Sequence, residues 1–297
     1  MDYIPAKTIV NNSPSPAWFG VHYNMNIYRG CSFGCIYCDS RSLCYKIENF
    51  EKIRAKHDAL CIIRADLLKK RKVGVIATGA MSDPYNPYEK ELKLTQNALE
   101  LINAYGFGVA IATKSDLISR DVSVLKDIQS KAPVIIKLTL TTVSDKLAGL
   151  IEPHAPSPSR RLAALKTLTG EGLYAGILMM PILPFITDNP EAIIHLLQQA
   201  KENGARFIYP SFGVTLRAGN RDYFYQKLDE RFSGLKQKYI NRYGQRYSCQ
   251  APNSKKLWQI FSEECQRLGL YFKMADIITD YKQAYRKRQL SLFVEEL

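Results

Sequence analysis

The chain has 297 residues, of which 46% are hydrophobic and 23% are charged. This balance is typical of globular proteins and excludes the disordered, collagen-like and coiled-coil classes. The net charge of +13 is concentrated late in the chain, since residues 206–297 hold 17 basic and 9 acidic side chains. A basic C-terminal third indicates either a polyanion partner, nucleic acid first among them, or a solvated basic surface.

The apolar segments and the cysteines predict a cytoplasmic protein without a membrane partner. Residues 1–13 lack the apolar core of a secretion signal, and the longest apolar stretch, 172–186, is too short to cross a bilayer. The 7 cysteines are an odd number, and three of them fall between residues 31 and 38. This pattern argues against a secreted disulfide framework and favours metal binding in a reducing compartment.

Short apolar runs alternate with helical patterns through the first 210 residues. Strands are predicted at residues 23–29, 73–78, 107–113, 134–140, 174–180 and 206–210. Helices are predicted between them at residues 59–71, 92–105, 121–131, 159–169 and 191–203. Gly106, Gly170 and Gly204 each follow one of these helices, as C-terminal glycines do, and Pro190 stands where a first helical turn tolerates proline.

Strand–helix alternation predicts an α/β protein with parallel strands joined by right-handed crossovers. Nearly continuous apolar runs at 109–112 and 134–136 are typical of strands buried on both faces. Six such units fit either an open doubly wound sheet or an incomplete barrel. After about residue 220 the chain becomes helical, basic and rich in tyrosine. We therefore predict an α/β part over residues 1–220 and a basic, mainly helical extension over residues 221–297.

The most specific feature is a cysteine loop that follows the first predicted strand. Cys31, Cys35 and Cys38 have the spacing C-x3-C-x2-C, and Gly30 and Gly34 allow the backbone to fold closely around a metal centre. Soft thiolates this close together converge on one centre. Three cysteines leave one iron of a [4Fe–4S] cluster open. A zinc ion would need a fourth ligand, for which the chain offers His57, Cys44 and Cys61.

A C-x3-C-x-aromatic-C motif after the first strand of six βα units resembles the radical S-adenosylmethionine (SAM) superfamily, over roughly residues 20–210. The resemblance implies a partial (β/α)6 barrel of the TIM type, with a [4Fe–4S] cluster on the three cysteines and SAM at its open iron. Further segments are similar to the spore photoproduct lyase-like branch, which is related to DNA repair photolyases. They are Ser82-Asp83-Pro84-Tyr85, Thr113-Lys114, Glu152-Pro153, Pro156-Ser157 and the five residues from Met180 to Pro184.

The same resemblance implies which side chains hold SAM. Tyr37 would lie beside the adenine, Ser82 or Asp83 would bind the amino group, and Lys114 would contact the carboxylate or the ribose. Thr139 and Pro181 complete the implied SAM site. Three of these features also have a purely structural explanation. Asp83-Pro84 is a common turn sequence, Lys114 can form an ion pair, and threonine at position 139 has a high strand propensity.

The implied activity is reductive cleavage of SAM to methionine and a 5′-deoxyadenosyl radical, which abstracts hydrogen from a substrate. An electron donor such as flavodoxin or ferredoxin would be required. We do not predict thymine-dimer repair, because Ala80 stands where that branch carries the cysteine that returns a hydrogen atom. The alternative is a non-catalytic iron–sulfur or zinc module that binds nucleic acid, which would not explain six βα units.

Two segments of the extension predict partners. Arg242, Arg246, Lys255 and Lys256 interleave with Tyr243 and Tyr247, which suits phosphate contact and base stacking, or else a tyrosine-lined helix that docks on the barrel. Near the C-terminus a short peptide resembles the one by which bacterial polymerases and repair proteins dock on the replication sliding clamp. It consists of Gln289, Leu290, Ser291, Leu292 and Phe293. The alternative is a tail helix that packs its leucines on the barrel.

Overall fold

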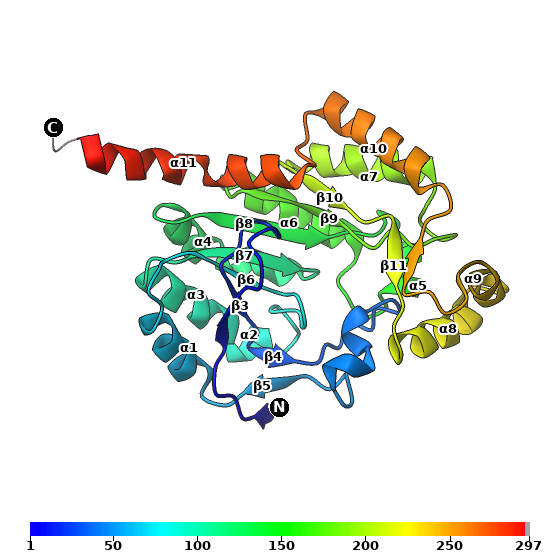
Figure 1. The fold of residues 1–297 in the computed structure, drawn as a ribbon, viewed down its shortest axis with the longest axis horizontal. Helices are drawn as coiled ribbons and strands as arrows, with labels where there is room; N and C mark the ends of the chain where they lie inside the picture. Colours follow the sequence, from blue (N-terminus) through cyan, green and yellow to red (C-terminus); the bar gives the residue numbers. More distant parts are fainter. Residues whose placement is uncertain (295–297) are drawn as a thin grey trace.

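A computed structural model describes residues 1–294 of the chain, with side chains through residue 285 (Figure 1). Its central sheet holds the six predicted parallel strands as direct neighbours, and the strand at one edge runs antiparallel. In spatial order they are β10 (Ile208–Pro210), β9 (Ala175–Met179), β8 (Val134–Thr139), β7 (Gly108–Thr113), β6 (Val75–Thr78), β3 (Tyr23–Met25) and β2 (Val10–Asn12). The predicted α/β fold with a partial parallel barrel is confirmed.

Five helices connect these strands and lie on the outer side of the sheet (Figure 1). They are α1 (Ala59–Leu68), α3 (Leu94–Ala104), α4 (Val122–Gln129), α6 (Pro158–Gly170) and α7 (Pro190–Glu202). Each overlaps a predicted helix, and Pro158 and Pro190 occupy first turns. Shorter helical segments fill the loops: η1 (Asp39–Arg41), η2 (Leu43–Tyr45), α2 (Glu89–Leu92), η3 (Asp116–Asp121) and α5 (Asp145–Ile151).

The first predicted strand differs from the prediction, because residues 23–29 divide between two sheets. The first half is β3 of the barrel, and the second half, β4 (Tyr28–Arg29), joins β5 (Arg54–Lys56) and β1 (Asp2–Ile4) in a small separate sheet. Between the two halves, the carbonyl of Ile27 accepts a hydrogen bond from the Lys56 amide at 3.0 Å. The chain therefore leaves the barrel before the cysteine loop begins.

The two faces of each barrel strand have different roles. On β8, Ile136 and Leu138 pack into the core beneath the outer helices. Because side chains alternate along a strand, Ile135, Lys137 and Thr139 point to the opposite, inner face. Ile135 packs with Phe207 and other residues that close the barrel from within. Side chains that could bind a ligand therefore lie on the inner face of the strands.

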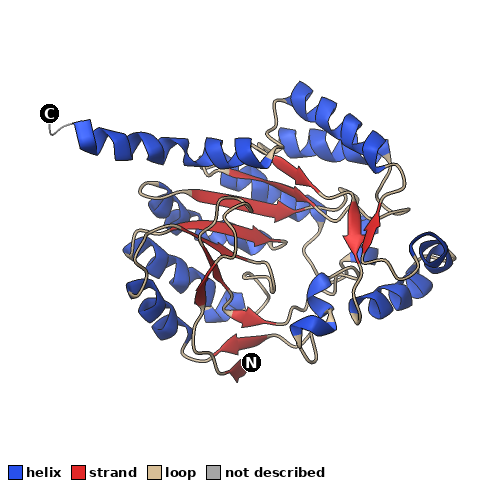
Figure 2. Ribbon diagram, in the orientation of Figure 1, coloured by secondary structure: helices blue, strands red, loops and turns tan. Residues whose placement is uncertain are grey.

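Helices of the extension pack against the barrel and its loops. It contains α8 (Asn220–Arg231), α9 (Leu235–Tyr243), β12 (Ser248–Gln250), α10 (Ser254–Leu268) and α11 (Met274–Val294). β12 pairs with β11 (Gly213–Thr215) in a two-stranded ribbon beside the main sheet (Figure 2). α10 lies along α7, and Ile277 and Tyr281 of α11 pack with Phe19 inside the barrel. The boundary at residue 220 stays a prediction.

Two predictions, a clamp-binding peptide and no contact with a membrane, can be compared only with the residues that the structure describes. The side chains of Gln289, Leu290, Ser291, Leu292 and Phe293, which form the predicted clamp-binding peptide, lie outside the described residues. Among the helices that the structure describes, none is both long and apolar enough to cross a membrane.

Gly79 and Gly106 provide a matched test of the barrel. Both have positive φ (+94° and +72°), but a Cβ on Gly79 would lie 1.8 Å from the Ala112 carbonyl oxygen, whereas one on Gly106 would meet nothing within 4 Å. Gly106→Ala should cost about 1–2 kcal/mol from backbone strain alone. Gly79→Ala should cost about 3 kcal/mol or more, because overpacking adds to the strain. Urea denaturation measures both, and equal losses would contradict the packing argument.

Candidate active site

The cysteine loop, residues 31–38, lies between β4 and η1 and is anchored by its backbone. The Cys31 amide donates to the Phe50 carbonyl at 2.8 Å, and the Ile36 amide donates to the Ile151 carbonyl at 3.0 Å. Gly30 has a φ of +84°, and a Cβ there would lie 2.5 Å from the Lys52 carbonyl oxygen. The turn into the loop therefore requires glycine, as the sequence predicts.

The three thiols suit a cluster better than a single ion. All three are free of disulfides, and burial raises the pKa of Cys31 to about 11 and that of Cys35 further. Among the described residues, no three His, Cys, Asp or Glu side chains converge on one point where they could hold one metal ion. Zinc needs all its ligands around one ion, whereas each cysteine of an iron–sulfur cluster binds a separate iron. His57 instead contacts Asp58 at 2.7 Å.

A cavity of about 500 Å³ opens beside the loop and brings most of the predicted site together. Its lining includes five of the predicted residues: Tyr37, Cys38, Lys114, Thr139 and Pro181. These side chains come from the cysteine loop and from the carboxyl ends of β7, β8 and β9. In barrels this end of the strands carries the catalytic groups. A pocket of this size is typical of cofactor and substrate sites.

Lys114 places a positive charge close to Cys35 of the cysteine loop. Burial alone lowers its pKa, but the neighbouring Cys35 and Glu152 outweigh burial, so that the pKa is raised. Its ammonium group lies 5.6 Å from the centre of the Tyr37 ring. A cation held between thiols and a carboxylate favours the thiolate form that binds iron. The residues present at this end of the cavity therefore fit an iron–sulfur cluster.

Ser82 and Asp83, predicted to bind the amino group of SAM, have other partners in the structure. The Ser82 hydroxyl donates to the Gly30 carbonyl at 2.5 Å. Asp83 accepts from the Thr113 hydroxyl at 2.6 Å and from the Lys114 amide at 2.8 Å. Neither residue is among those that line the cavity, whereas Gly79 and Ala80 of the same loop do line it. A role for Ser82 and Asp83 in SAM binding stays a prediction.

Glu152 and Arg161 form a buried ion pair at 2.6 Å. The Tyr37 hydroxyl donates to the same carboxylate, and Arg161 donates to the Thr139 carbonyl at 3.0 Å. Burial tends to raise the pKa of Glu152, but Arg161 and Lys114 reverse this effect and hold it below the usual range. The pair thus connects two predicted site residues, Tyr37 and Thr139, through a contact that the sequence analysis did not predict.

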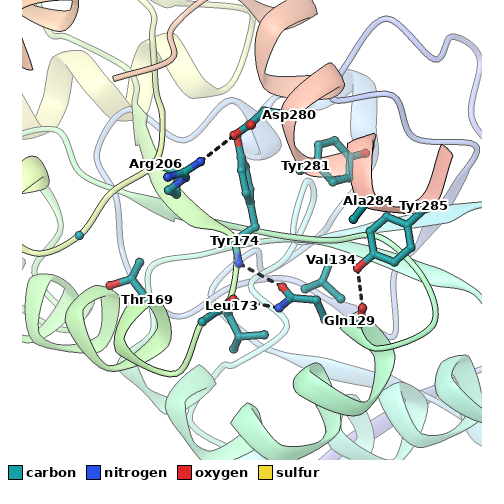
Figure 3. A pocket seen from close by; sticks show the side chains of 12 residues that line it. Gln129, Val134, Thr169, Leu173, Tyr174, Arg206, Asp280, Tyr281, Ala284 and Tyr285 are labelled. Carbon is teal, nitrogen blue, oxygen red and sulfur yellow. Dashed lines mark hydrogen bonds and ion pairs between the residues drawn. The ribbon is translucent and has the colours of Figure 1, made fainter. Parts of the chain in front are cut away.

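A second cavity, of about 510 Å³, lies at the opposite ends of the strands (Figure 3). It is lined by residues that precede the strands, such as Tyr174 and Arg206, and by α11. Arg206 pairs with Asp280 of α11 at 3.3 Å, and the Tyr285 hydroxyl donates to the Gln129 carbonyl at 2.5 Å. The amino ends of barrel strands serve stability. The cavity beside the cysteines is therefore the candidate active site.

Replacement of Glu152 by glutamine should destabilise the protein by about 3–5 kcal/mol, because Arg161 would remain buried without an anion. Since the pKa of Glu152 is lowered in the folded state, the stabilisation is present above pH 4.5 and is lost as the pH falls through the folded value. Urea denaturation measures the difference. Glu171→Gln, in an exposed pair with Lys126, is the control and should change stability little. Similar losses in both variants would contradict the role of the buried pair.

The sequence is similar to a known protein family and to proteins of other organisms. The family model of the radical SAM superfamily matches residues 25–197. An uncharacterised protein of Mycobacterium tuberculosis is 28% identical over 225 residues, which cover 73% of this chain and 66% of that protein, just under two thirds of its length. An uncharacterised protein of Methanocaldococcus jannaschii is 34% identical over 189 residues, which cover 62% of this chain and 68% of that protein.

Solved structures show the same fold. A mutant of spore photoproduct lyase has a TM-score of 0.67 at 16% identity, and the match covers 91% of this chain and 82% of that chain. Another mutant, with bound AdoMet and dinucleoside spore photoproduct, has a TM-score of 0.63 at the same identity and coverage. Because the family model covers more than half of the chain, this protein belongs to the radical SAM superfamily, whose members use a [4Fe–4S] cluster and SAM.

Proposed function

We propose that this radical SAM enzyme binds a [4Fe–4S] cluster through Cys31, Cys35 and Cys38 and SAM in the adjoining cavity, and that it abstracts hydrogen from a substrate. The observation that carries the proposal is the single cavity whose lining unites Cys38 with Tyr37, Lys114, Thr139 and Pro181. These residues were identified separately, by motif position, on four different segments of the chain. Their convergence supports one site for cluster and cofactor.

When bound, the cluster and SAM together supply a 5′-deoxyadenosyl radical and methionine, at the cost of one electron from a donor of the flavodoxin or ferredoxin type. The residues of the chain orient SAM and exclude water. Lys114 offers a positive charge to the carboxylate of SAM, and the Tyr37 ring offers a flat surface for the adenine. The apolar side chains of Leu178 and Met180 also line the cavity and would help to exclude water from a reactive radical.

Thymine-dimer repair is not part of the proposal. Ala80 lines the cavity and has no group that could return a hydrogen atom. The likeness to spore photoproduct lyase at 16% identity extends to the fold alone. Transfer of an isotope label from a candidate substrate to 5′-deoxyadenosine would identify the substrate.

A surface groove supports nucleic acid as the substrate class. The groove, of about 470 Å³, is lined by Lys255, by the exposed Trp258 and by both strands of the β11–β12 ribbon. Gly213 and Thr215 of β11 line both this groove and the cavity. A polyanion bound along the groove would therefore reach the cavity at β11. A lysine beside an exposed aromatic ring suits phosphate contact and base stacking.

The predicted interleaving of tyrosines and cations needs one correction. Tyr243 is buried, its hydroxyl donates to the Gln250 carbonyl, and its ring packs 5.5 Å from that of Tyr239. It therefore docks α9 and is not free to stack on a base. Tyr247 is exposed and lies beside Arg217. Binding of residues 289–293 to a sliding clamp stays a prediction.

Anaerobic assay of the reconstituted protein tests the proposed chemistry. With dithionite and SAM, the protein should form 5′-deoxyadenosine, and replacement of Cys31, Cys35 or Cys38 by alanine should abolish both bound iron and product. Cys44→Ala and Cys61→Ala are the controls, because both thiols are exposed and outside the loop. They should retain iron and activity. A colourless zinc protein that leaves SAM intact would instead support the non-catalytic alternative.

Salt titration tests the groove with single-stranded DNA. Lys255→Gln combined with Lys256→Gln should lower the slope of log affinity against log salt by about 1.4, since each lysine that contacts a phosphate of a single strand contributes about 0.7. Trp258→Ala should weaken binding by about 1–3 kcal/mol at every salt concentration, because stacking is not ionic. Lys69→Gln, at an exposed position directly after α1, is the control. Binding that does not weaken as salt rises would contradict a phosphate contact.

A further inference from the structure

Lys137 lies on the inner face of β8, with 2% of its surface exposed, and lines the cavity beside the cysteine loop. Its ammonium group lies 4.5 Å from the centre of the Phe19 ring. Within the described part of the chain, no carboxylate forms an ion pair with it, and no hydrogen bond from its side chain is found. The lysine therefore extends into the barrel with an aromatic face as its neighbour and no anion.

The neighbouring strands keep space open beside this lysine. Lys137 pairs in register with Ala112 of β7 and with Gly176 of β9, so its two lateral neighbours have almost no side chain. A Cβ on Gly176 would lie 2.3 Å from the Phe207 carbonyl oxygen, which fixes glycine at this position. On the β9 side the Phe207 ring fills the space beside Gly176, whereas on the β7 side Ala112 lines the cavity and leaves room beside the lysine. The lysine can thus reach a bound molecule.

The other charged residues that line the cavity are already balanced. Asp39 pairs with Arg217 at 3.3 Å and accepts from the Tyr45 hydroxyl at 3.0 Å. Lys114 is offset by Cys35 and Glu152. Lys137 has no such compensation, and burial alone lowers its pKa to about 7. An ammonium group buried without an anion is costly, so an anion that enters the cavity would gain a strong partner.

We propose that Lys137 binds an anionic oxygen group of the substrate, a phosphate or a carboxylate, at the floor of the cavity. The proposal rests on the proposed function, because it assigns the carboxylate of SAM to the end of the cavity at Lys114. Lys137 lies two residues before Thr139 on β8, which places it about 7 Å deeper in the barrel. A substrate anchored there would present its carbon–hydrogen bonds upward to SAM. Hydrogen transfer requires this kind of near contact.

Anion binding to the purified protein tests the proposal without any catalytic assay. Inorganic phosphate, thymidine monophosphate and acetate are titrated calorimetrically at constant ionic strength. Lys137→Met should weaken phosphate binding by about tenfold or more, and Lys137→Arg should retain it within about threefold, because charge is kept. Lys69→Met, on the exposed surface, should bind as the wild type does. Phosphate and nucleotide binding without acetate binding would assign a phosphorylated substrate; preferential acetate binding would assign a carboxylate.

Two outcomes would overturn the proposal. The first is that the wild type and Lys137→Met bind phosphate with equal affinity and also bind acetate with equal affinity. The second is a loss of SAM binding of about tenfold in Lys137→Met, measured by equilibrium dialysis, which would assign the lysine to SAM. The proposed function is judged separately by formation of 5′-deoxyadenosine in the wild type. A protein that forms this product but shows no Lys137-dependent anion binding would refute only the present inference.

Thermal stability provides a second readout. Because the pKa of Lys137 is lowered from 10.5 to about 7, the unfolded chain binds more protons between these values, and wild-type stability rises with pH across this window. Lys137→Met removes the buried charge. Its Tm should exceed that of the wild type at pH 7 and below, and the difference should decline toward pH 10.5. A lower Tm for Lys137→Met at neutral pH would show that the ammonium group already has a partner, and would refute the proposal.

Discussion

The buried ion pair between Glu152 and Arg161 holds the active site together. Such a pair adds little net stability, because both charges must be desolvated, but it fixes geometry wherever its remaining hydrogen bonds are satisfied. Here those bonds run to the Tyr37 hydroxyl and to the Thr139 carbonyl. The cysteine loop is thereby tied to the end of β8. Together with the backbone hydrogen bonds of the loop, this ion pair sets how the three cysteines lie relative to the proposed SAM contacts.

The barrel was predictable because its strands have strong patterns. Residues 109–112 and 134–136 are continuous apolar runs, which only strands buried on both faces require. The small sheet β1–β5–β4 was missed, since Asp2–Ile4 and Arg54–Lys56 are three-residue strands with no periodicity. The prediction that Tyr243 is available for base stacking was wrong for a related reason. The sequence does not show which face of its helix packs against the rest of the protein, and Tyr243 lies on the buried face.

The sequence predicted the candidate site well where metal binding requires a fixed spacing of residues. It predicted the site less well where packing decides which way a side chain points. The three cysteines follow from a motif that only a metal centre explains. Ser82 and Asp83 also belong to a motif, yet their oxygen atoms hold the loop to Gly30 and Thr113. Lys137 was overlooked although it shares a strand face with Thr139. A lysine at an inner position of an apolar strand is the signal that could have revealed it.

Volume inside a packed barrel has to be created against the tendency of cores to fill. In this protein small residues leave it open, since Gly79, Ala80 and Ala112 line the cavity. The cavity also borders two lysines: Lys114, directly after β7, is balanced by thiols, and Lys137 on β8 is not balanced. The end at Lys114 suits a cofactor that carries both charges, because the lysine is already paired. The end at Lys137 would be stabilised most by an anion. The two ends of the cavity therefore favour different ligands.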